Sequence, residues 1–228
     1  MLRTMNPPPR APASAPRAPR LGLLVFGLLV LTAPPVAMGV VRLVGMGLGR
    51  ETLPDHARLM TQPAFLGAHI VSASLFVTLG ALQFAPALRR SGLHARLGRF
   101  VALAGGVAAA TGLGLVATLP YGEGEGLLLR GLRVVSGLAL ATCVCLGLLA
   151  LRAPRDLRRH RAWMMRAYAT GAATGTQFLI ALPYASIVAE PSQEVLVLLL
   201  AVAWGINLAV AEWVRRRPQP QSVRWEAA

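Results

Sequence analysis

Long apolar stretches alternate with short polar segments over most of the chain. Six of these stretches are each close to the ~20 residues that an α-helix needs to cross a bilayer. The pattern therefore predicts an all-α, polytopic membrane helix bundle with about six transmembrane helices. We place the spans at about residues 21–41, 65–87, 98–119, 130–151, 165–189 and 194–214.

The two ends of the chain differ from this transmembrane domain, which covers residues 21–214. Residues 1–20 hold six prolines among alanine and arginine, so we expect a disordered basic tail. Residues 215–228 form a second basic tail. A secretory signal peptide is a second interpretation of the first apolar stretch. We favour a retained helix, kinked at Pro34–Pro35, because the apolar character continues past Ala33.

Composition supports the membrane class. The chain is 55% hydrophobic and only 14% charged, whereas soluble domains carry about 25% charged residues. A net charge of +14 would suggest a nucleic-acid partner in a soluble protein. Here all 23 basic residues are arginine, and they gather at the ends of the apolar stretches. We therefore expect anionic lipid headgroups as partners and no nucleic acid.

The arginines also predict an orientation. The two tails and the connections after the second and fourth predicted spans hold 18 of the 23 arginines. Six of the nine acidic residues lie in the opposite connections. Because basic segments stay on the cytoplasmic side, we expect an inner-membrane protein with both termini in the cytoplasm.

Two of the basic segments are similar to each other. APALRRSGLHARLGRF (85–100) and APRDLRRHRAWMMRAY (153–168) both begin with Ala-Pro, continue through Leu-Arg-Arg and a histidine, and end on an aromatic residue. Each segment joins an inward-running helix to an outward-running one. This predicts two parallel hairpin repeats, in which His94 and His160 are equivalent positions at the cytoplasmic edge of a four-helix core.

This histidine pair suggests a haem b site. Imidazoles on two facing helices are common axial ligands of haem iron, and nearby arginines suit the propionates. The candidate residues are His94 and His160 as iron ligands, with Arg99, Arg161, Arg166 and Trp163 around them. The specific hypothesis is a b-type haem-binding or electron-transfer membrane protein.

A second hypothesis is a non-catalytic, transporter-like or scaffold membrane protein. In this case the basic segments bind anionic lipid or a small anion, and Trp163 lies at the membrane interface. The sequence shows no nucleophile with its base and no paired intramembrane carboxylates. It therefore leaves open whether the chain is an enzyme.

Further candidates lie toward the opposite side. His69 is an ionisable group a turn or two into the second predicted span, and Arg130 and Arg133 begin the fourth span one turn apart. One interpretation is that they line an outer vestibule for an anion. The alternative is that the histidine is bonded to a neighbouring polar group and the arginines reach outward to phosphates. We also expect Glu212 to pair with Arg215 or Arg216, and Gly105, Gly106, Gly112 and Gly114 to mediate close helix packing.

HARLGRF and HRAWMMRAY together resemble a bacterial membrane-protein family known only as domain of unknown function twenty-three-zero-six. The resemblance covers roughly residues 65–180. The second motif fits at His160, Arg161, Trp163, Met164, Arg166 and Tyr168, which adds Tyr168 to the candidate residues. Ala95 departs from the first motif, and Gln177–Phe178 stand where the family favours an arginine. The resemblance implies a membrane helical core and names no activity.

Overall fold

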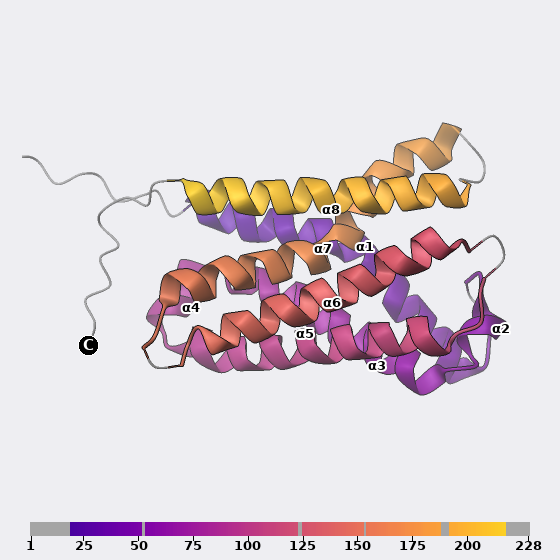
Figure 1. The fold of residues 1–228 in the computed structure, drawn as a ribbon, viewed down its shortest axis with the longest axis horizontal. Coiled ribbons are helices and arrows are strands. Elements are labelled where there is room, and N and C mark those ends of the chain that lie inside the picture. Colours follow the sequence, from indigo (N-terminus) through magenta and orange to yellow (C-terminus); the bar gives the residue numbers. More distant parts are fainter. Residues whose placement is uncertain (1–18, 52, 123–124, 153, 188–191, 218–228) are drawn as a thin grey trace, which may run out of the picture.

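The computed structural model describes residues 19–51, 53–122, 125–152, 154–187 and 192–217 of the chain (Figure 1). The predicted tails therefore lie almost entirely outside the described residues. Within the described ranges the secondary structure is helical throughout, which confirms the predicted all-α class. The helices are α1 (Pro19–Leu48), α2 (His56–Leu59), α3 (Pro63–Leu82), α4 (Pro86–Arg90), α5 (Leu93–Thr118), α6 (Leu127–Leu149), α7 (Leu157–Ile187) and α8 (Gln193–Arg216).

Five of the described helices are long and apolar enough to cross a membrane: α1, α3, α5, α6 and α8. The chain is thus a multi-pass membrane protein with about five spans of this kind. The predicted span at 165–189 falls on α7, which is 31 residues long but lacks the apolar character of the others. Its first turns carry the arginine cluster, and its second half contains threonines, Gln177 and Pro183. The six-span prediction therefore differs from the structure at this one helix.

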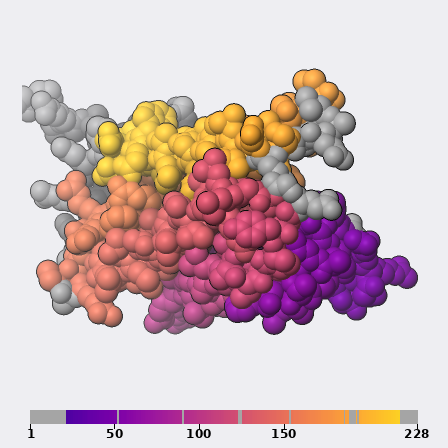
Figure 2. Space-filling model, turned by 45° about the vertical axis from the view of Figure 1, so that its right-hand side comes forward, coloured from indigo at the N-terminus to yellow at the C-terminus, as the bar shows by residue number. Residues whose placement is uncertain are grey.

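The arrangement of the helices explains why α7 can be more polar. It runs along the length of the bundle and packs against α1, α3, α6 and α8 (Figure 1). The other packed pairs include α3 with α5 and α5 with α6, so α3, α5, α6 and α7 form a four-helix core. α1 covers α3 and α7, while α8 lies along one side of the molecule (Figure 2). A helix covered on several sides exposes less surface to lipid and needs fewer apolar residues.

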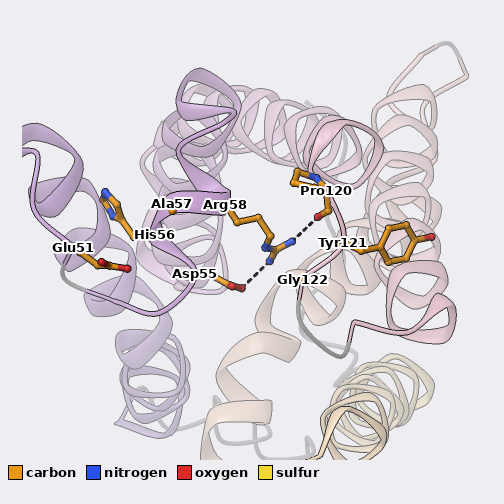
Figure 3. A pocket seen from close by; sticks show the side chains of 8 residues that line it. All are labelled: Glu51, Asp55, His56, Ala57, Arg58, Pro120, Tyr121 and Gly122. Atoms are coloured by element: carbon orange, nitrogen blue, oxygen red, sulfur yellow. Dashed lines mark hydrogen bonds and ion pairs between the residues drawn. The ribbon is translucent and has the colours of Figure 1, made fainter.

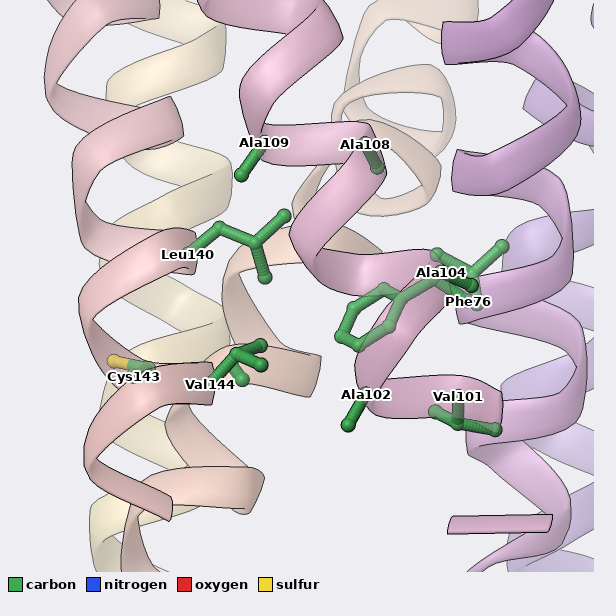
Figure 4. Packing of buried hydrophobic residues seen from close by; sticks show 11 residues of the cluster. Phe76, Val101, Ala102, Ala104, Ala108, Ala109, Leu140, Cys143 and Val144 are labelled. Atoms are coloured by element: carbon green, nitrogen blue, oxygen red, sulfur yellow. The ribbon is translucent and has the colours of Figure 1, made fainter. Parts of the chain in front are cut away.

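Phe76 of α3 lies at the centre of the core and is 1% exposed. Alanine and valine side chains of α5 and α6 surround it (Figure 4). A methyl group on Gly105 of α5 or Gly171 of α7 would approach the Phe76 ring to 2.8 and 2.7 Å, respectively. These glycines therefore make room for the ring.

The predicted glycine packing is confirmed at three of its four positions. Gly105 meets Phe76, Gly112 lies against the His69 ring and Gly114 against the Phe65 ring. A methyl group on Gly106 would meet nothing within 4 Å, so that prediction is wrong. Consecutive helical residues point about 100° apart, so Gly105 and Gly106 cannot both face the same neighbour.

The basic segments gather at one end of the bundle, which we call the basic end. It contains α4, the α6–α7 connection and the last turn of α8, and α1 also begins there (Figure 1). The opposite end, which we call the acidic end, contains α2 and the α5–α6 connection (Figure 1). At the basic end Asp156 caps α7, because its carboxylate accepts a hydrogen bond from the Arg159 N–H at 2.9 Å. The internal repeat stays a prediction.

Candidate functional site

His160 lies in the first turn of α7, and its imidazole is held by α6. Its Nδ1 lies 2.8 Å from the carbonyl oxygen of Gly147. A carbonyl oxygen only accepts hydrogen bonds, so Nδ1 carries the proton and donates it. In the neutral ring, Nε2 therefore keeps a free lone pair.

His94 lies in the first turn of α5 and has the opposite arrangement. With its nitrogen turned toward the ring, the Gln83 carboxamide donates to His94 Nδ1 at 2.7 Å. The same orientation lets the Gln83 oxygen accept from the Gly98 N–H at 3.3 Å. A neutral imidazole that accepts at Nδ1 carries its proton on Nε2. The Nε2 of His94 is thus a hydrogen-bond donor, whereas the Nε2 of neutral His160 is an acceptor.

Four basic residues from three helices lie within electrostatic range of one another at the basic end: Arg89, His94, His160 and Arg161. We call this group the basic corner. Partial burial lowers the pKa of the Arg89 guanidinium, and the charge of Arg161 lowers it further. Arg89 and His160 also lie near enough to His94 for a charge on them to disfavour a positive charge on its ring. Within the described part of the chain, no carboxylate acts on Arg89 or His94.

The sequence analysis places Arg166 and Trp163 in the histidine site. In the structure they contact each other, and Arg166 also binds Glu212. The Arg166 guanidinium lies 4.6 Å from the centre of the Trp163 ring, and its Nε donates to Glu212 of α8 at 2.7 Å. Glu212 also binds Arg215 at 2.7 Å, which confirms that predicted pair. The Arg166–Glu212 pair was missed because the two residues are 46 positions apart. It joins α7 to α8.

Arg99 and Tyr168 also lie apart from the basic corner. Arg99 is exposed on α5, and in the part of the chain that is described it forms no hydrogen bond or ion pair. Tyr168 is buried, and its hydroxyl donates to the Val77 carbonyl oxygen at 3.2 Å. Its ring packs edge-on against Phe84. The Tyr168 contacts join α7 to α3.

The structure does not bring His69, Arg130 and Arg133 together as an outer vestibule. His69 Nδ1 donates to the Ala108 carbonyl oxygen of α5 at 3.0 Å. This contact matches the alternative prediction, in which the histidine is bonded to a neighbouring polar group. Arg130 donates to the Val116 and Leu119 carbonyl oxygens at the end of α5 and stacks on Tyr121. Arg133 pairs with Glu125. These contacts stabilise the acidic end of the bundle.

A shallow pocket at the acidic end was missed by the sequence analysis. Figure 3 shows its lining between the α2 segment and the α5–α6 connection. Arg58 crosses it, binding Asp55 at 2.8 Å, the Pro120 carbonyl oxygen at 3.1 Å and Glu125 at 3.2 Å. Arg58 and Glu125 are 67 residues apart, so no local pattern indicates their pairing. Arg58, Arg130 and Arg133 at this end are thus partnered, unlike Arg89 and Arg161.

The histidine geometry fits haem ligation only in part. An axial histidine donates its Nδ1–H to a protein acceptor and ligates iron through Nε2, as His160 is placed to do. His94 carries its proton on Nε2 in the orientation set by Gln83, which does not suit ligation. Among the described residues, no group of three or more His, Cys, Asp or Glu side chains could hold a metal ion.

A family model described as "predicted membrane protein (DUF2306)" matches residues 66–215. The chain belongs to this family. The DUF2306 match begins in α3 and ends in the last turn of α8, so it contains the four-helix core and every residue of the basic corner. It confirms the resemblance inferred from the two motifs and extends it through α8. No curated protein and no solved structure matches the chain significantly.

Proposed function

We propose that this DUF2306 protein binds an anionic ligand at its basic corner, in a transporter-like or scaffold role. One observation carries the proposal: Arg89 and Arg161 lie near enough for their charges to repel, and neither forms an ion pair with a carboxylate of the described residues. Two like charges held near each other repel. A bound anion attracts both of them and offsets this repulsion. Guanidinium groups also match carboxylate and phosphate oxygens geometrically.

The acidic end supports the proposal by contrast. There Arg58 and Arg133 share the Glu125 carboxylate, and Arg130 is held by backbone carbonyl oxygens at the end of α5. These three arginines, which stabilise the acidic end, thus have partners within the chain. Arg89 and Arg161 form no hydrogen bond or ion pair in the described part. Arg99 forms none either, but the charges of Arg89 and Arg161 repel each other, which favours an external anion.

Replacing Arg161 with glutamine tests the proposal. We expect Arg161→Gln to weaken retention of anionic phospholipid about tenfold, because one charge-assisted hydrogen bond contributes about 1.5–3 kcal/mol. Native mass spectrometry of the detergent-purified protein measures this retention. Arg99→Gln is the matched control, since it removes the same charge from an exposed residue at the same end. Equal retention by both variants would remove the support for the basic corner.

Arg166→Gln provides a second comparison. Because Arg166 already binds Glu212, this change should lower thermal stability by loosening α8 from α7, while lipid retention stays near the wild-type value. This comparison separates an effect on stability from an effect on the ligand site.

We also propose that the basic end faces the cytoplasm of an inner-membrane protein. The gathering of arginine-rich segments at one end of the bundle supports this orientation (Figure 1). A reporter fused to the C-terminus tests it. Green fluorescent protein should fluoresce there, and alkaline phosphatase should be inactive; an active phosphatase would contradict the orientation.

A b-type haem protein is the second candidate function. The hydrogen bond from His160 Nδ1 to the Gly147 carbonyl oxygen favours it, because it leaves Nε2 free to ligate iron. Haem would supply one-electron transfer when bound. The visible spectrum of protein purified from haem-replete cells decides between the candidates. A Soret band that is lost in His160→Ala would support haem, whereas a colourless preparation would exclude it.

A further inference from the structure

The pocket at the acidic end is a second place where the chain offers unpaired polar groups. Its volume is about 410 Å³, the space of on the order of a dozen water molecules at ~30 Å³ each. Arg58 and Pro120, which are 62 positions apart, both line it (Figure 3). The pocket lies at the opposite end of the bundle from the basic corner, so it is independent of the anion site proposed above (Figure 1).

Two arginines hold the walls of this pocket. Arg42 of α1 donates to the carbonyl oxygens of Leu53 and Pro54 at 3.3 and 2.8 Å, which ties the segment before α2 to α1. Arg58 ties α2 to the α5–α6 connection through the contacts described above. Because these walls are already fixed, a ligand would lose little affinity to the ordering of the pocket.

The charge of the pocket favours a cation. Asp55 and Glu125 pair with Arg58, and Arg133 shares the Glu125 carboxylate, so these charges offset one another. Glu51 lines the same pocket but forms no hydrogen bond or ion pair in the described part of the chain. Its carboxylate therefore carries a negative charge that no described side chain of the pocket offsets.

The pocket also has acceptors for a ligand that donates hydrogen bonds. Asp55 binds Arg58 through Oδ2, and among the described residues its Oδ1 has no partner. His56 lines the pocket, and its Nδ1 is buried and unpaired within the described ranges. In the tautomer protonated at Nε2, this atom accepts a hydrogen bond, and leaving it unpaired is costly. The Arg58 Nε is also unpaired, but Gly122 packs against that part of the guanidinium.

The spacing of these groups favours an organic cation over a metal ion. Glu51, Asp55 and His56 all line the pocket, yet in the described part of the chain they do not form a group that could hold a metal ion. An organic molecule that fills the pocket is able to reach acceptors that are too widely spaced for one small ion.

From the cavity, its charge and its free acceptors we infer that the pocket binds an organic ligand through a primary ammonium group. Such a group combines a positive charge with three N–H donors. The same chemistry belongs to a soluble amine and to the headgroup of phosphatidylethanolamine. The choice of probes separates these two sources.

The experiment measures binding to the full-length protein in detergent at pH 7 by isothermal titration calorimetry. The probes are ethanolamine with choline, and dihexanoyl phosphatidylethanolamine with dihexanoyl phosphatidylcholine. Both members of a pair have the same charge, but choline and its lipid have methyl groups in place of the N–H donors. We expect at least one primary amine to bind about tenfold more tightly than its methylated partner, the effect of roughly one charge-assisted hydrogen bond. Binding of the lipid alone indicates a headgroup site, and binding of free ethanolamine indicates a site for soluble amines.

Variants connect this binding to the pocket. Glu51→Gln should weaken it about tenfold, and His56→Phe, which keeps a ring but no lone pair, should weaken it as well. Glu194→Gln is the matched control, because Glu194 is an exposed carboxylate at the start of α8, at the same end but outside the pocket lining (Figure 1). Equal affinity for the primary and methylated amines, or unchanged affinity in Glu51→Gln, would overturn the inference. Absence of binding by all four probes would overturn it as well, without affecting the anion proposal.

Discussion

Replacing Gly175 with alanine is expected to destabilise the protein more than any other single methyl addition at a glycine of the described structure. A Cβ atom at Gly175 of α7 would overlap the backbone carbonyl oxygen of Leu31 in α1 and lie 3.0 Å from its carbonyl carbon. Other close glycines face side chains that are able to rotate, but here the obstacle is backbone. Relief therefore requires α1 to move away from α7.

The expected cost of Gly175→Ala is about 3 kcal/mol, at the upper end of values for overpacking. Thermal unfolding in detergent measures it as a lower midpoint. Gly205→Ala on α8 is the control, because a Cβ atom there meets nothing within 4 Å. Its expected effect is neutral or slightly stabilising, since alanine favours helix by up to about 1 kcal/mol. Equal midpoints for the two variants would contradict the close α1–α7 packing.

The second large effect is expected for Glu125→Gln. The Glu125 side chain is only 6% exposed, yet it binds Arg58, Arg133 and the Gly122 N–H. Glutamine keeps the size of the side chain but removes its charge, so two arginines lose their shared counter-charge. Breaking a buried ion pair on one side costs about 3–5 kcal/mol, and partial exposure of Arg133 places the expected loss near the lower value.

Glu51→Gln is the matched control for this variant. Glu51 is an exposed carboxylate of the same pocket, and it has no ion pair in the described part of the chain. Thermal unfolding should show a large decrease for Glu125→Gln and almost none for Glu51→Gln. A similar small change in both would mean that the Arg58–Glu125–Arg133 contacts contribute little to stability.

The features that the sequence predicts well depend on local composition. The helices that match five predicted spans follow from continuous apolar stretches, and the basic end follows from arginines at the borders of those stretches. The pairing of Glu212 with Arg215 follows from helical spacing. Each of these properties is encoded within about one helix length.

The missed features depend on contacts between distant segments. Arg130 and Arg133 were expected either to line an outer vestibule or to reach outward to phosphates, but their partners are carbonyl oxygens at the end of α5 and the Glu125 carboxylate. Arg89 was absent from the predicted site because only the fold brings its charge within range of Arg161. The span assignment of α7 differed because packing covers a helix whose own composition is polar. In each case tertiary packing, rather than residue spacing, determines the outcome.

The most direct test of the central claim is a cryo-electron microscopy map of the full-length protein purified with anionic lipid and phosphate. The account predicts density for a bound anion at the basic corner, in contact with Arg89 and Arg161. A map that resolves these side chains and shows a carboxylate of the chain itself between the two arginines would contradict it.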